Sequence, residues 1–182
     1  MVMIEPDDAG VVQPDPHDLA SFSRMIREHD RRLRALAFRL LAGDASRLDD
    51  VMQESYINAY RALGRFLGDS DAGGWLYRIT YNACMDELRR ARRRPVPVEV
   101  VPEAFDRDRA TGPEQRAVNR DDVARALAAL TPDQRAVIAL VDGDGFDVAT
   151  AAGIIGVATG TVKSRLSRAR ATMRAALGEE HR

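Results

Sequence analysis

Apolar residues recur at intervals of three and four along much of the chain, which is the spacing of an amphipathic α-helix. In the N-terminal half this pattern predicts helices over residues 19–41, from about 46 to 63, and over 75–92. Their apolar faces are formed by Phe22, Met25, Ile26, Leu33, Leu36, Ala37 and Leu40 in the first, by Leu48, Val51, Met52, Ser55, Tyr56, Ala59 and Leu63 in the second, and by Leu76, Ile79, Ala83 and Leu88 in the third. Each helix is therefore expected to turn one face toward a core.

Polar residues and glycines mark where these helices begin and end. Gly43 and Asp44 close the first helix. Ser46, with Asp49 three residues later, resembles a capping box and predicts the start of the second helix. Residues 68–74 combine glycine with aspartate and predict a loop before the third helix.

Two stretches lack the helical period. Residues 1–18 hold prolines among acidic and small residues, which predicts a disordered tail. Pro95 and Pro97 end the third helix, and the acidic stretch that follows predicts a flexible linker over 95–113. The linker is the predicted domain boundary.

Helical spacing resumes after the linker in shorter segments. Residues 121–130 predict one helix, and the next begins at 131–134, where Thr stands at the N-cap, Pro at the first helical position and Gln at the third. Asp147 is expected to cap a short helix that ends at Gly156, and Thr159 to cap the last one. A short helix, a glycine turn and a basic helix follow the order of a helix-turn-helix.

Composition agrees with this reading. The chain has 182 residues, 45% of them hydrophobic but only 5% aromatic, and Ala, Leu and Arg are abundant, which favours helix over sheet. We therefore predict an all-α protein of two small helical domains, residues 19–94 and 114–178, with a short tail at 179–182.

The net charge of −1 hides a separation of charge along the chain. Residues 159–178 hold basic residues and no acid, and residues 88–94 are rich in arginine. The first twenty residues and 99–114 are acidic. Local basic patches on a nearly neutral chain indicate specific phosphate contacts and not a general affinity for polyanions.

Several classes of protein are not supported by the residues present. The single cysteine, Cys84, excludes a disulfide or a cysteine-based zinc site within the chain and is predicted to be a small buried residue. Residues 142–147 resemble the start of a calcium loop, but no glutamate stands at its twelfth position. No catalytic triad, apolar membrane span or signal peptide is recognisable. We expect a cytoplasmic, non-enzymatic protein without metal or cofactor.

The last helix has the pattern of a DNA-reading helix. Its polar positions are Thr161, Lys163, Ser164, Arg165 and Arg168, while Val162, Leu166, Ala169 and Met173 recur at three and four and face inward. A helix in the major groove reads bases from its first turns and contacts phosphates through flanking Arg and Lys. The alternative is a solvated basic helix, but its position after a glycine-terminated short helix favours DNA binding.

The predicted helix over 75–92, with the arginines that follow it, combines aromatic and basic residues. Its aromatic and amide residues are Trp75, Tyr77, Tyr81 and Asn82, and its arginines include Arg78, Arg89 and Arg90. Such a mixture suits unpaired bases, which stack on rings while arginines hold phosphates. Equally, Trp75 and Tyr81 could be core residues and the arginines could stabilise a helix C-terminus. Spacing leaves both interpretations open.

Five segments occur in an order that resembles a known family. They are DDVMQESY at 49–56, WLYRI at 75–79, NACMDELRR at 82–90, LTPDQRAV at 130–137 and GTVKSRL at 160–166. Over about 22–177 the chain resembles bacterial extracytoplasmic-function (ECF) sigma factors of the sigma-70 superfamily. Any one segment is modest support, whereas the five in this order are specific.

The resemblance implies a role for each helix. It places Asp49, Asp50, Gln53 and Glu54 on the helix that docks on core RNA polymerase. It assigns the melted −10 strand to Trp75, Arg78, Tyr81, Asn82, Arg89 and Arg90, and the −35 duplex to Thr159, Thr161, Lys163, Ser164, Arg165 and Arg168. The implied partners are the largest catalytic and second largest polymerase subunits, promoter DNA and an anti-sigma factor.

Two other functions compete with this one. A stand-alone helix-turn-helix regulator would bind duplex DNA unaided, but would need neither the acidic helix at 48–56 nor the Trp75 segment. An interaction protein that acts as an anti-sigma mimic or decoy would not need Lys163 and Arg165.

Overall fold

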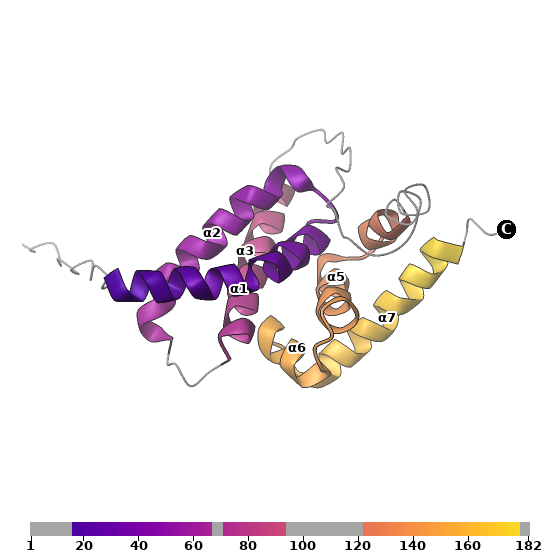
Figure 1. Ribbon diagram of the computed structural model, residues 1–182. Coiled ribbons are helices and arrows are strands. Elements are labelled where there is room, and N and C mark those ends of the chain that lie inside the picture. Colours follow the sequence, from indigo (N-terminus) through magenta and orange to yellow (C-terminus); the bar gives the residue numbers. More distant parts are fainter. Residues whose placement is uncertain (1–15, 67–70, 94–121, 179–182) are drawn as a thin grey trace, which may run out of the picture.

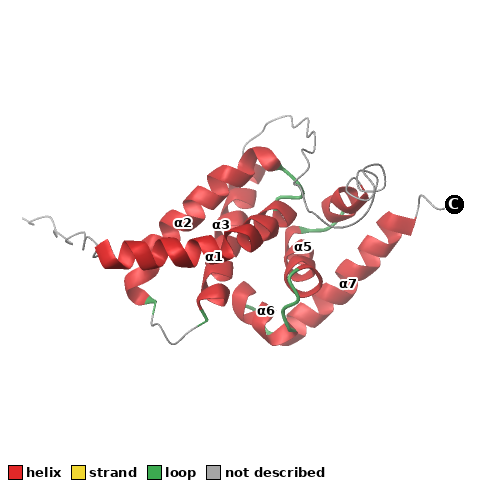
Figure 2. Ribbon diagram, in the orientation of Figure 1, coloured by secondary structure: helices red, strands yellow, loops and turns green. Residues whose placement is uncertain are grey.

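The computed structural model describes residues 16–66, 71–93 and 122–178. Within these ranges the regular elements are helices, and no strand occurs (Figure 2). The predicted all-α class is confirmed for the described residues. The predicted linker lies outside them, as does the predicted tail except for 16–18.

Three long helices form the N-terminal unit, as the apolar pattern predicted. They are α1 (Pro16–Leu40), α2 (Leu48–Ala62) and α3 (Ala72–Arg93), joined by the short 3₁₀ turns η1 (Ala45–Arg47) and η2 (Leu63–Arg65). The three helices pack against one another (Figure 1), and Leu36, Met52 and Leu76, one from each helix, are almost completely buried. Burial of such side chains contributes about 1.5–3 kcal/mol each.

The helices begin at other residues than predicted. α1 starts at Pro16, so the predicted disorder of 16–18 is wrong; proline suits the first helical position because its missing N–H has no partner to lose there. The predicted capping box at Ser46 is also wrong. The carboxylate of Asp44 accepts the backbone N–H of Ser46 at 3.1 Å and starts η1, which leads directly into α2.

The start of α3 was predicted too late. Asp71 accepts the backbone N–H groups of Gly73 and Gly74, each at 3.0 Å, so both glycines lie in the first helical turn and not in a loop. Gly73 also lies against α1, because a Cβ there would be 3.2 Å from Cε1 of His29. A glycine pair usually indicates a loop, but here the aspartate satisfies the free donors of the helix end.

The C-terminal unit consists of shorter helices. A helix over 122–128 precedes α5 (Pro132–Ile138), the π-helical turn η3 (Ala139–Gly143), α6 (Val148–Ile155) and α7 (Thr159–Gly178). The structure confirms the capping box of α5, the Asp147 cap of α6 and the left-handed Gly156 that ends α6 at φ 79°. Thr159 lies one residue inside α7, since the carbonyl of Ala158 accepts the N–H groups of the first turn.

The two units pack against each other. α6 contacts α3, α5 contacts α1, and α7 lies on the outer side of the C-terminal unit (Figure 1). The buried residues of both units form one hydrophobic cluster. The pattern of the sequence predicted the two groups of helices but not their direct contact.

Candidate nucleic-acid interface

The acidic side of α2 is open to solvent. Asp49, Asp50 and Gln53 are exposed and Glu54 is half-buried. Asp49 accepts a hydrogen bond from Nη1 of Arg34 at 2.7 Å, and this bond is the main cause that raises the pKa of the Arg34 guanidinium. Within the described part of the chain, the side chains of Asp50 and Gln53 form no ion pair or hydrogen bond.

An apolar residue that the sequence analysis missed lies on this side of α2. Ile57 is 43% exposed and follows Gln53 by four residues, which places both on one side of the helix. In the sequence, Ile57 is an apolar residue outside the predicted buried face of α2, and this was the signal that could have identified it. A single exposed isoleucine is common on protein surfaces, so Ile57 by itself does not indicate a contact site.

The aromatic rings of Trp75 and Tyr81 in α3 are less accessible than stacking of bases on them would require. Tyr81 is only 8% exposed and packs as a core residue. Trp75 is half-buried and lies against Phe66, with ring centroids 4.7 Å apart and planes tilted by 35°. The structure therefore favours the core interpretation for Tyr81, while Trp75 keeps an accessible part and Asn82 is exposed.

Most of the predicted polar residues of α3 share one face. Trp75, Arg78, Asn82 and Arg89 follow the helical repeat, whereas Arg90 is turned toward α2. Arg90 donates to both carboxylate oxygens of Glu54, at 2.7 and 2.8 Å.

Two arginines on that face already have partners. Arg89 pairs with Asp86, one helical turn away, and Arg78 donates to the backbone oxygen of Gly153 in α6 at 2.8 Å. The Arg78 bond joins the N-terminal unit to the C-terminal unit. The guanidinium of Arg78 is therefore already engaged within the protein.

The predicted −35 residues of α7 do not form a single surface. Thr161, Ser164 and Arg168 lie together: Ser164 Oγ donates to the Thr161 carbonyl at 3.0 Å, and Arg168 Nε donates to the Ser164 carbonyl at 3.2 Å. Arg165 turns away from them and pairs with Asp133 of α5 at 2.6 Å, with 23% of its side chain exposed.

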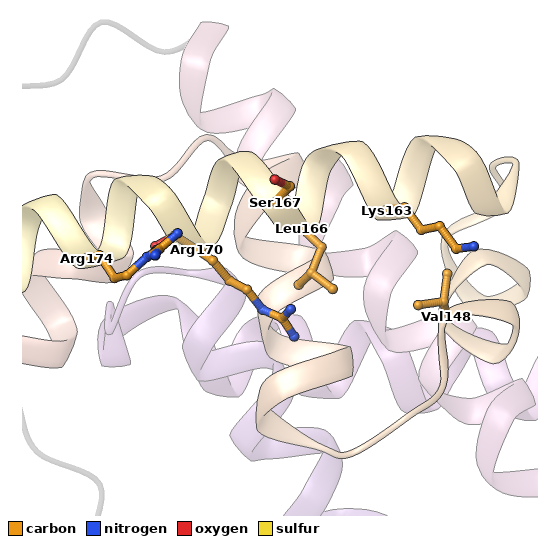
Figure 3. Close-up of a pocket in the computed structure, with 6 residues that line it drawn as sticks. All are labelled: Val148, Lys163, Leu166, Ser167, Arg170 and Arg174. Atoms are coloured by element: carbon orange, nitrogen blue, oxygen red, sulfur yellow. The ribbon is translucent and has the colours of Figure 1, made fainter.

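Lys163 lies on the other flank of α7, at a hollow of about 440 Å³ (Figure 3). Val148 and Leu166 provide its apolar lining, and the polar residues are Lys163, Ser167, Arg170 and Arg174. The last three were not among the predicted DNA residues, although Arg170 and Arg174 continue the basic pattern of the helix. Arg170 donates two hydrogen bonds to Asp142, at 2.6 and 3.0 Å.

The residues considered for a redox or calcium site have structural roles. Cys84 is fully buried, and burial raises the pKa of its thiol to about 12. The suspected calcium-loop residues Asp142 and Asp144 pair with Arg170 and Arg39. In residues 16–66, 71–93 and 122–178, no cluster of His, Cys, Asp or Glu could hold a metal ion, and no helix is long and apolar enough to cross a membrane.

Comparison with known proteins matches each unit to a family model. The family model for Sigma-70 region 2 matches residues 25–94, and the model for Sigma-70, region 4 matches residues 120–173. The N-terminal match covers the acidic helix and α3, and the C-terminal match covers the helix-turn-helix and most of α7.

Proteins of similar sequence are named as RNA polymerase sigma factors. The ECF RNA polymerase sigma factor SigM of Mycobacterium tuberculosis is 41% identical over 162 residues, which cover 88% of this chain and 79% of the relative. The RNA polymerase sigma-H factor of Pseudomonas aeruginosa is 33% identical over 188 residues, which cover 97% and 96%.

Two solved structures have a similar fold. The sigma factor RpoE in complex with the anti-sigma factor NepR from Bartonella quintana has a TM-score of 0.73 and 29% identity, covering 87% of this chain and 97% of that one. CnrH in complex with the cytosolic domain of CnrY has a TM-score of 0.66 and 27% identity, covering 88% and 90%. With its sequence relatives and both regions matched, the chain belongs to the ECF RNA polymerase sigma factors.

Proposed function

We propose that this chain is a promoter-specificity subunit that works only together with core RNA polymerase and divides its contacts among α2, α3 and α7. It directs the polymerase to specific promoters by binding −35 duplex and melted −10 DNA. Phosphodiester synthesis belongs to the polymerase, so the chain itself is not an enzyme. The observation that carries this proposal is the combination of a solvent-exposed acidic side of α2 with the two basic helices α3 and α7 in one sigma-family chain.

The polymerase contact is assigned to α2. Asp50 and Gln53 are the leading residues because no intramolecular bond of their side chains has to break, and Ile57 adds an apolar contact. Asp49 is bound to Arg34 and Glu54 to Arg90. These two carboxylates contribute once they release the arginines and bind groups of the polymerase. This surface distinguishes the chain from a stand-alone regulator, which has no need of it.

The melted −10 strand is assigned to the face of α3 that carries Trp75, Arg78, Asn82 and Arg89. Asn82 offers an exposed amide that can form hydrogen bonds with a base edge, and Trp75 offers part of a ring for stacking. A base flipped from the duplex loses a few kcal/mol of stacking, which such contacts offset. Tyr81 supports this face from the core.

The −35 duplex is assigned to α7. Thr161 and Ser164 are suited to base edges in the major groove because they lie in the first two turns of α7, where Thr161 is half-buried and Ser164 exposed. Arg168, which is exposed one turn further on, extends the same surface. Lys163 and Arg174, on the flank with the hollow, are suited to phosphates. Arg165 joins the base contacts after leaving Asp133.

An anti-sigma factor is a further proposed partner. Two of the solved structures that resemble this chain are, by their descriptions, a complex of the sigma factor RpoE with the anti-sigma factor NepR and a complex of CnrH with the cytosolic domain of CnrY. Purification from the native host under non-inducing conditions tests this proposal. A bound inhibitory protein is expected, whereas recovery of only free or polymerase-bound chain in every condition would contradict it.

Transcription with purified core polymerase on a promoter library tests the main function. The chain is expected to select promoters with the enzyme and to bind promoter duplex weakly without it. Tight, sequence-specific binding of the free chain to duplex DNA would instead favour the stand-alone regulator.

A further inference from the structure

A second hollow, of about 490 Å³, lies between the C-terminal half of α3 and the turn that leads into α5. Its volume is within the range of small-molecule sites. It is lined by Arg47, Leu88, Ala91, Arg92, residues 128–132 and Arg135. None of these residues belongs to the polymerase or DNA surfaces proposed above, and no acidic residue is among the described residues of the lining. The hollow therefore has three cations and no assigned function.

One of the three arginines is buried. Arg135 of α5 is 6% exposed and donates to three backbone carbonyls: Leu40 at 2.6 Å, Leu127 at 3.0 Å and Leu130 at 3.0 Å. These bonds fix the side chain and leave further N–H groups of the guanidinium for a ligand. Buried charges in proteins are usually paired, but among the described residues no carboxylate forms an ion pair with this one. Its positive charge therefore acts on whatever enters the hollow.

The second arginine adds to this charge. Arg92, near the end of α3, is exposed, and within the described residues its side chain forms no ion pair or hydrogen bond. The pKa of the Arg135 guanidinium is lowered, first by burial and then by the positive charge of Arg92. The two cations therefore repel each other across the hollow, and an anion between them relieves this repulsion.

The third arginine is only partly engaged. Nε of Arg47, in η1, pairs with Asp44 at 2.8 Å, while the amino groups of Arg47 form no hydrogen bond within the described residues. The planar guanidinium presents its N–H groups as a fork, which matches two oxygens of a phosphate. Three positive charges and the one negative charge of Asp44 leave two positive charges uncompensated around the hollow.

The walls between the cations are apolar. Leu88 and Ala91 of α3 are half-buried, and Ala128 and Pro132 contribute from the C-terminal unit. Apolar walls with a few charged groups are typical of sites for small ligands that have both a polar and an apolar part. A bare anion uses only the arginines, whereas a molecule with a flat ring system also buries apolar area against these side chains.

We propose that this hollow is a binding site for a phosphate-bearing small molecule of mononucleotide size. Its phosphates lie between Arg47, Arg92 and Arg135, and its ring system lies against the apolar walls. The site goes beyond the proposed function, because it requires neither promoter DNA nor core polymerase. A nucleoside diphosphate has the matching size and charge, so ADP and GDP serve as the probes.

Calorimetric titration of the full chain tests the class of ligand. ADP and GDP are expected to bind, pyrophosphate to bind several-fold more weakly because it lacks the ring system, and adenosine not to bind measurably because it lacks the phosphates. Equal affinity for ADP and adenosine would overturn the inference, as would the absence of ADP binding at millimolar concentration. Equal affinity for ADP and pyrophosphate would overturn the ligand class, because the apolar walls would then have no part in binding.

Two variants locate the site, each with a matched control. Arg92→Ala is expected to weaken ADP binding about tenfold, since a charge-assisted hydrogen bond is lost. Arg93→Ala, at the exposed neighbouring position outside the lining, should leave ADP binding unchanged. Ala128→Leu narrows the hollow without a change of charge and should also weaken binding, whereas Ala175→Leu, at an exposed position of α7, should not. A circular-dichroism melt verifies the fold of all four variants.

Nucleic acid is the alternative source of phosphate, and short single-stranded DNA titrated into the same variants distinguishes the two. If Arg92→Ala and Ala128→Leu weaken the binding of DNA but not that of ADP, the hollow is an extension of the nucleic-acid surface and the inference is overturned. Equal effects of Arg92→Ala and Arg93→Ala on ADP binding would also overturn it, because ADP would then be attracted by the arginine-rich end of α3 as a whole and not bound in the hollow.

Discussion

Asp50 and Asp49 stand side by side in α2, yet their surroundings differ. Asp49 is held by Arg34 at 2.7 Å, whereas in the described part of the chain the carboxylate of Asp50 has no partner. A free carboxylate can meet a basic partner without first losing an internal bond. The sequence pattern predicted both residues as one acidic surface and could not distinguish them, because the distinction depends on α1, which meets α2 only in the folded chain.

Asp50→Arg should therefore impair the contact with core polymerase. Like charges at a protein interface cost several kcal/mol, and we expect a loss of that size in association. A pull-down with core enzyme measures it, and a circular-dichroism melt verifies the fold. Asp86→Arg, an exposed position on α3, gives the same change of charge away from α2 and serves as the control. Undiminished binding by folded Asp50→Arg would refute the assignment of this surface.

Arg165 and Lys163 should differ in what they recognise. If Arg165 leaves Asp133 for a base, Arg165→Ala should cost roughly 1–3 kcal/mol and relax the preference at one −35 position. Lys163 is assigned to a phosphate, so Lys163→Ala should weaken binding to all promoters alike. It should also lower the slope of log affinity against log salt concentration by about one unit. Binding of the holoenzyme to a set of −35 variants at several salt concentrations measures both. Equal base preferences in the two variants would contradict this division.

At the scale of elements, the sequence was enough to predict a helix end where the hydrogen-bond donor and acceptor are neighbours in the chain. The α5 capping box, the Asp147 cap and the Gly156 turn depend on residues within one turn, and all three are confirmed. The start of α2 was predicted wrongly because Asp44, two residues before Ser46, captures its N–H first. For α7 the sequence predicted the helix and its inward face, since Val162, Leu166 and Ala169 are buried. It did not predict that Asp133 of another helix turns Arg165 away from the other polar residues.

The start of α3 should control promoter opening. Asp71→Ala removes the side chain that accepts the N–H groups of Gly73 and Gly74, and loss of a helix cap costs about 1 kcal/mol. Fraying of this turn would displace the neighbouring Trp75. We expect impaired transcription from duplex templates and substantial rescue by a template with a pre-melted −10 bubble. Asn82→Ala should likewise leave initial duplex binding nearly intact and impair opening.

The matched control for α3 is a cap in the other unit. Asp147→Ala removes the corresponding bond to the Thr150 N–H, 2.7 Å long, at the start of α6. Its loss lies in the unit assigned to the −35 duplex, so a pre-melted −10 bubble should not rescue it. Equal rescue of the two variants would show that the bubble compensates for general instability and not for a damaged −10 surface.

For the whole molecule, the contact between the units is what the sequence could not predict. Arg39 and Asp144 are separated by 105 positions, and Arg135 and Leu40 by 95. No local period connects such residues, and an arginine in an amphipathic helix usually indicates a solvated face. The buried position of Arg135 is visible only once α1 ends beside it.

This shared core predicts how the chain unfolds. Because buried residues of both units form one cluster, calorimetry should record a single cooperative transition for the described fold. Arg135→Met keeps much of the apolar volume but removes the donor to the Leu40 and Leu130 carbonyls, and each unsatisfied group costs about 1–3 kcal/mol. The Leu127 carbonyl loses one donor but still accepts the N–H of Leu130 at 3.2 Å. The expected result is a lower melting temperature and separation into two transitions, since Leu40 loses its bond to the second unit. Two transitions in the wild-type chain would contradict the shared core. A single transition at the wild-type temperature in Arg135→Met would show that the buried cation does not couple the units.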